Sequence, residues 1–304
     1  MMQGTEHPIT AGTERPQAAS RNARNGGAPA DVELEVHLLG TFEVLWLRGR
    51  VPIASASARA LLAILALRGR PQLRDDLAAE LWPELESARS SAALRQALWL
   101  LRGALSEAGA DPNAIISAAE ETVGLEPHLG IMVDVSRFEA LLGDRPPRIE
   151  QAARLYRGDL LVARGNEYFA RERDRLGDLF EDCLATLIRV RLARNDLDGA
   201  MAAARRLLDR DPLREEAHGA LIEIYGRTGS RAQVARQYRR LRVVLEDELD
   251  VAPLPETEAV YRTALVRTHQ RSFEVAQRMT MPSPGAAEQA AAGRGKDARE
   301  TLHR

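Results

Sequence analysis

Residues 88–105, "ARSSAALRQALWLLRGAL", combine three arginines and one glutamine without any acidic residue. Arginine can donate two hydrogen bonds to guanine O6 and N7, and glutamine can pair with adenine N6 and N7. Arginine also binds phosphates, which position a protein on a duplex without specifying its sequence. The chemistry available here is nucleic-acid recognition, and the candidate contact residues are Arg89, Ser91, Ala92, Arg95, Gln96, Trp99 and Arg102.

The spacing of the apolar residues predicts that this stretch is one amphipathic helix. A single stripe, which should face a core, holds Leu94, Leu98, Leu101 and Leu105. The opposite face holds Arg89, Ala92, Ala93, Gln96, Trp99, Leu100 and Gly103. Gln96 is the predicted base reader and Arg89 a second one, whereas Arg95 and Arg102 lie on the flank, within reach of phosphates.

The elements around this helix predict a winged helix-turn-helix domain. Residues 32–38 alternate apolar and polar side chains, which is typical of a half-buried strand, and leave His37 on the solvated side. The segment "TFEVLWL" repeats this period, and a short third strand is expected around Val51–Ile53, giving a small antiparallel sheet. Three helical patterns follow, the first ending at Gly69. Short β-runs around 115–117, 122–125 and 131–133 then supply the hairpin expected after the third helix.

The second half of the chain predicts an all-α domain of stacked helix pairs. Aligning Asn195 with Gly229 also aligns Leu207 with Leu241, at the offset of a tetratricopeptide repeat. Ala200 and Val234 then share one small, packed position. Neighbouring helices are expected at 149–160, 168–194 and 256–268, because such repeats need neighbours to bury their faces. The predicted organisation is a disordered tail at 1–31, a winged helix at 32–142, a linker at 143–148, the helical domain at 149–272 and a disordered tail at 273–304.

Composition and motifs weigh against an enzyme and against a membrane protein. The six histidines have no metal-ligand spacing, and neither a Gly-rich phosphate loop nor a nucleophile motif is present, so neither a cofactor nor a metal is expected. Cys183 stands alone in a helical run and is expected to be a small buried residue. The acids Glu246–Asp247–Glu248 fit a solvated helix end. No long apolar run occurs, which predicts a soluble, cytoplasmic protein.

Over residues 32–265 the chain resembles antibiotic-regulatory (SARP-type) activators. The pieces "LGTFEV", "RALLAILAL", "LAAELWP" and "LRQALWLLRGAL" resemble an OmpR/PhoB-like winged helix. The long segment "RDPLREEAHGALIEIYGRTGSRAQVARQYRRLRVVLEDELDVAPLPETEAVYRTAL" resembles the bacterial transcriptional activator domain. The resemblance implies a transcriptional activator that binds promoter DNA, commonly as a homodimer on direct repeats. It also implies that the helical domain dimerises or contacts RNA polymerase.

Two features leave a second hypothesis open. Relatives are expected to read Arg, Ser, Ser and Arg where this chain has Ser91, Ala93, Trp99 and Gly103, all on or near the outward face. Residues 32–142 also hold ten arginines against fifteen acidic residues, and the acids gather in the expected wing. Both features fit a protein-interaction adaptor whose winged helix is degenerate, with Trp99 either packed against neighbouring elements or forming a partner-binding patch.

Overall fold

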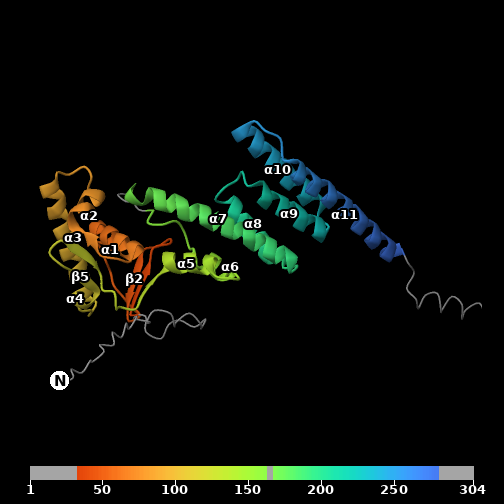
Figure 1. The fold of residues 1–304 in the computed structure, drawn as a ribbon. Coiled ribbons are helices and arrows are strands. Elements are labelled where there is room, and N and C mark those ends of the chain that lie inside the picture. Colours follow the sequence, from red (N-terminus) through yellow and green to blue (C-terminus); the bar gives the residue numbers. More distant parts are fainter. Residues whose placement is uncertain (1–32, 163–166, 281–304) are drawn as a thin grey trace, which may run out of the picture.

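The computed structural model describes residues 33–162 and 167–280 of the 304-residue chain, and Figure 1 shows their arrangement. The strands are β1 Leu34–His37, β2 Glu43–Trp46, β3 Gly49–Arg50, β4 Gln72–Leu73, β5 Ile116–Ala118, β6 Thr122–Leu125 and β7 Ile131–Val133. The N-terminal helices are α1 Ala56–Arg68, α2 Arg74–Leu81, α3 Ser87–Glu107, α4 Pro112–Ile115 and α5 Asp134–Gly143. The remaining helices are α6 Ile149–Leu155, the 3-10 turn η1 Glu167–Phe169, α7 Ala170–Ala193, α8 Leu197–Leu208, α9 Glu215–Thr228, α10 Arg231–Leu249 and α11 Pro255–Thr280.

The first sheet has the strand order β3-β2-β1-β7. β1 and β2 pair antiparallel, as their alternation predicts, with Val36 opposite Val44 and both side chains buried. Two predictions about this region were wrong. The third strand is Gly49–Arg50, with Val51 and Ile53 buried in the coil that follows. The last β-run does not extend the wing, because β7 crosses back and pairs parallel to β1, which makes this sheet mixed.

Three helices and a second sheet complete the winged helix. α1 begins at Ser55, whose hydroxyl accepts a hydrogen bond from the backbone N–H of Ala58, and it ends at the left-handed Gly69, as predicted. α2 and α3 pack against each other, and α3 also packs on α1. Strands β4, β6 and β5 pair antiparallel in that order, so the wing is the β5–β6 hairpin.

The end of β1 and the residues after it are held by buried contacts with α5 and with Leu160 of the helical domain. The carboxylate of Asp134, at the start of α5, accepts backbone hydrogen bonds from Leu38 and Leu39 at 2.9 Å. Burial raises its pKa, although these bonds act in the opposite direction. His37 lies beside it, with Nδ1 3.9 Å from the carboxylate and a side chain only 12% exposed, so its predicted solvation was wrong. The segment after β1 also contacts the helical domain, because Leu39 forms an isolated antiparallel β-bridge with Leu160.

An aromatic cluster fills the joint between α5, α6 and α7. Tyr156 stacks on Phe180 with ring centroids 4.0 Å apart, and Phe138 packs against Tyr156 at 5.4 Å. All three rings are buried. The guanidinium of Arg206, from α8, lies 4.5 Å from the Phe180 centroid, which is within range of a cation–π contact. These contacts tie the first helices of the second domain to the end of the winged helix.

Helices α6 to α11 stack in succession, each packed on its neighbours. The predicted repeat alignment agrees with the burial, since Ala200 and Val234 are both fully buried, as are Leu207 and Leu241. Three helix ends differ from the prediction: α6 ends at Leu155, α7 begins at Ala170, and α11 continues to Thr280. The predicted tails lie outside the described residues, except for this last stretch of α11.

Candidate nucleic-acid interface

α3 is held in place by the leucine stripe that its sequence predicts. Leu94, Leu98, Leu101 and Leu105 are all buried, and Ala97 fills the space between them. At the start of the helix, the buried Ser90 hydroxyl donates a hydrogen bond to the carbonyl of Ser87 at 3.0 Å. The helix is therefore anchored along one side and at its first turn, and its opposite side is fixed in orientation.

The outward side of α3 brings most of the predicted contact residues together. Arg89, Ala92, Arg95, Gln96 and Trp99 are exposed, as is Gly103 further along. At 3.6 residues per turn, Ala92, Gln96, Trp99 and Gly103 follow one line along the helix. Gln96 therefore stands at the centre of the exposed surface, where its amide is free to meet a base edge.

The two flanking arginines differ in their surroundings. Arg95 is exposed and makes no ion pair with the described residues. Arg102 is half-buried, and its Nε is buried without a hydrogen-bond partner among the described residues. Ser91, on the same flank, is also half-buried. A buried N–H without a hydrogen-bond partner costs free energy.

Trp99 and Leu100 take different places, although they are adjacent in the chain. Leu100 is partly buried and packs against the core. Trp99 is 67% exposed and is the most exposed large hydrophobic side chain among the described residues. Packing of Trp99 against the wing or the helical domain, one of its two predicted roles, is therefore not present. The other predicted role of Trp99, in a partner-binding patch, stays a prediction.

The wing is short, and the residues of its tip include no basic side chain. β5 and β6 are joined through Ala119, Glu120 and Glu121, all exposed. The hairpin is tied to the start of α2, since Arg74 donates through Nε to the carbonyl of Ala119 at 3.1 Å. At the base of the hairpin, a Cβ on Gly124 would lie 2.9 Å from the Cα of Pro71, so glycine allows the close approach. The wing is positioned firmly, but its charge disfavours phosphate.

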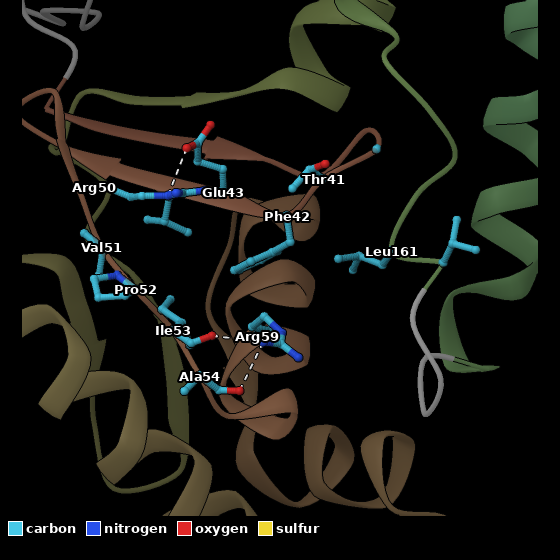
Figure 2. Close-up of a pocket in the computed structure, with 13 residues that line it drawn as sticks. Thr41, Phe42, Glu43, Arg50, Val51, Pro52, Ile53, Ala54, Arg59 and Leu161 are labelled. Carbon is cyan, nitrogen blue, oxygen red and sulfur yellow. Dashed lines mark hydrogen bonds and ion pairs between the residues drawn. The ribbon is translucent and has the colours of Figure 1, made fainter.

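A pocket of about 470 Å³ lies between the first sheet and α1, beside Leu161 (Figure 2). Its two arginines are engaged: Arg59 donates to the carbonyls of Ile53 and Ala54 at 3.1 Å, and Arg50 pairs with Glu43 at 3.1 Å. Its remaining lining is mostly apolar, so the pocket offers no free group for anion binding or acid–base chemistry.

Other groups able to do chemistry are held in structural roles. Cys183 is buried, as predicted, and burial raises the pKa of its thiol to about 11. No group of three or more His, Cys, Asp or Glu side chains within residues 33–162 and 167–280 is arranged to hold a metal ion. None of the helices in those ranges combines the length and hydropathy needed to cross a bilayer.

The fold and the α3 surface together define a class: a winged-helix protein with a tetratricopeptide-like helical domain. Residues 133–265 match the family described as the bacterial transcriptional activator domain. The chain is therefore similar to that domain from the start of α5 to the middle of α11. The match begins at Val133, so it includes α5 as well as the stacked helices.

Curated relatives extend the similarity across both domains. Regulatory protein AfsR of Streptomyces coelicolor is 28% identical over 259 residues, which cover 80% of this chain but 26% of AfsR. Transcriptional regulatory protein EmbR of Mycobacterium tuberculosis is 27% identical over 254 residues, covering 77% of this chain and 64% of EmbR. Transcriptional regulatory protein MoaR1 of the same species is 27% identical over 263 residues, covering 80% and 81%.

A solved structure has the same fold. Mycobacterium tuberculosis EmbR in complex with a low affinity phosphopeptide aligns with a TM-score of 0.60 at 24% identity, over 81% of this chain and 72% of that one. Because the alignment covers 81% of this chain, the shared fold extends over both the winged helix and the stacked helices.

Proposed function

We propose that this chain is a DNA-binding transcriptional regulator, an activator that binds promoter DNA through α3. The observation that carries the proposal is the fixed outward face of α3, where exposed Gln96 lies beside Arg95 and about two helical turns after Arg89. Arg95 and Arg102 would contact phosphates, and Gln96 would read adenine. The matched regulators support this role. The protein would act in the cytoplasm, without enzymatic activity or cofactor.

Trp99 adds an apolar element to this surface. It follows Gln96 by one helical turn, so both side chains would enter the same groove. Apolar side chains contact the thymine methyl group in the major groove. We infer that Ser91 and Ala92 allow close approach of the helix, and that Trp99 favours thymine next to the adenine read by Gln96.

The helical domain would serve homodimerisation or contact with RNA polymerase. Its position supports this role, because α9 to α11 lie at the opposite end of the molecule from α3 (Figure 1). A surface so far from the reading helix stays accessible when that helix is on DNA.

The second candidate is the adaptor, favoured by the 67% exposure of Trp99 and by the acidic wing tip. Selection from a pool of random-sequence duplexes separates the two functions. We expect the wild type to enrich a sequence, Gln96→Ala to change its adenine preference, and Arg95→Ala to weaken binding to all duplexes alike. Gln151→Ala, an exposed glutamine on α6, is the matched control and should leave the enriched sequence unchanged. If the wild type enriches no sequence, sequence-specific DNA binding is excluded and the adaptor function is favoured.

A further inference from the structure

The surface of α10 is divided sharply by charge. Its first twelve residues hold five exposed arginines and no acid: Arg231, Arg236, Arg239, Arg240 and Arg242. The following residues to the end of the helix and its cap hold four exposed acids and no base: Glu246, Asp247, Glu248 and Asp250. Within the described part of the chain, none of these nine side chains forms an ion pair.

This distribution of charge is unfavourable for the stability of α10 itself. The N-terminus of a helix favours acidic side chains and the C-terminus favours basic ones, because of the orientation of the peptide dipoles. α10 has neither an acid in its first turn nor a base in its last. The division of charge is therefore not explained by the stability of α10.

The inner side of α10 is packed against the rest of the helical domain. Val234, Leu241 and Leu245 are buried, and Tyr238 stacks on Tyr261 of α11 with centroids 3.9 Å apart. The side away from these contacts carries the charges together with Val243, which is 51% exposed. Val243 lies at the boundary between the basic and the acidic parts.

Basic and acidic residues lie at matching distances on the two sides of Val243 along the helix. Arg240 and Glu246 lie at equal distances before and after it, and Arg239 and Asp247 do the same one residue further out. At 100° per residue, these side chains share the outward face centred on Val243. A second α10 laid antiparallel across this face would place each basic part on an acidic part. A parallel pair would place like charges together.

We propose that α10 pairs antiparallel with α10 of a second copy of this chain, about a two-fold axis at Val243. The surface is self-complementary, as a two-fold interface requires. Arg239 would meet the partner's Asp247, Arg240 would meet the partner's Glu246, and each contact occurs twice. This deepens the homodimer part of the proposed function by assigning its surface, while needing no DNA.

Charge reversal with rescue tests the pairing. Sedimentation velocity without DNA measures self-association over concentrations reaching about 100 µM, because small polar interfaces associate weakly. The wild type should dimerise, and added salt should weaken the dimer. R239E/R240E and E246R/D247R should each associate roughly tenfold or more weakly, because like charges then face each other. An equimolar mixture of the two variants should dimerise again, since acidic and basic faces meet once more.

The mixture also controls for misfolding, because a variant that is unfolded cannot restore association with the other variant. The charge-exchanged chain R239E/R240E/E246R/D247R should also form a homodimer. A wild type that stays monomeric, single variants that stay dimeric, or a mixture that stays monomeric would each overturn the proposal. If the wild type is monomeric and R239E/R240E loses affinity for a random-sequence duplex, the arginines contact phosphate instead. Failure of DNA reading leaves the dimer measurement untouched, so the two proposals fail separately.

Discussion

DNA binding by this chain should depend only weakly on salt, and Arg95→Ala should weaken that dependence further. The reason is the small number of basic side chains on the outward side of α3. Arg89 and Arg95 are exposed on α3 and Arg102 is half-buried beside them, whereas the wing tip offers Glu120 and Glu121. Even when Arg89, the second predicted base reader, is counted with Arg95 and Arg102, α3 offers at most three phosphate contacts per protomer.

The expected magnitude follows from this count. Each neutralised phosphate contributes about −0.9 to the slope of log affinity against log salt, so three contacts give roughly −2.7 for each bound protomer. Raising salt from about 50 to about 200 mM should then weaken binding roughly forty-fold in the wild type. With two contacts left in Arg95→Ala the slope is about −1.8, and the same change of salt weakens binding roughly twelve-fold.

Fluorescence anisotropy on labelled duplexes from the region upstream of the chain's own gene measures both slopes. Arg194→Ala is the matched control, because Arg194 is 69% exposed at the end of α7, away from the reading surface. Its slope should equal that of the wild type. An Arg95→Ala slope equal to the wild-type slope would refute the placement of Arg95 on phosphate. A wild-type slope steeper than about −5 for each bound protomer would mean that cations outside α3 supply many of the contacts.

Three further predictions concern the helical domain. Gly226→Ala should destabilise the fold by about 1–3 kcal/mol in urea unfolding, because the new Cβ would lie 2.7 Å from the Cβ of Ala264 on α11; unchanged stability would contradict this packing. Burial lowers the pKa of His218, whose Nδ1 accepts from Gln237 at 2.8 Å, so the folded state resists its protonation. The free energy of unfolding should therefore fall as pH drops below about 6.5, and fall less in His218→Asn; equal pH profiles would exclude the titration. Native Cys183 should react with a thiol reagent at pH 8 only on unfolding, because its thiol has a pKa of about 11 and is buried; rapid labelling of the native protein would show that the thiol is accessible.

Much of α3 could be predicted from the sequence, because helix periodicity is a local property. The apolar stripe of α3, the exposure of Gln96 and the αL end of α1 at Gly69 all follow from spacing and residue type. The 34-residue offset likewise placed Ala200 and Val234 in equivalent buried positions. The assignment of DNA contacts to individual side chains of α3 stays a prediction.

The tertiary structure decided what depends on partners distant in the chain. The sequence marked residues 131–133 as a strand, but only the fold pairs them with β1 instead of the wing, since strand pairing is settled by long-range contacts. It placed His37 outward, whereas Asp134, far along the chain, covers that position. The order of basic and acidic residues in α10 is a property of the sequence. The exposure of these side chains and their lack of ion pairs with other described residues depend on how α9 and α11 pack against the helix. Local periodicity fixes elements and their faces, and burial by neighbours determines which faces remain available.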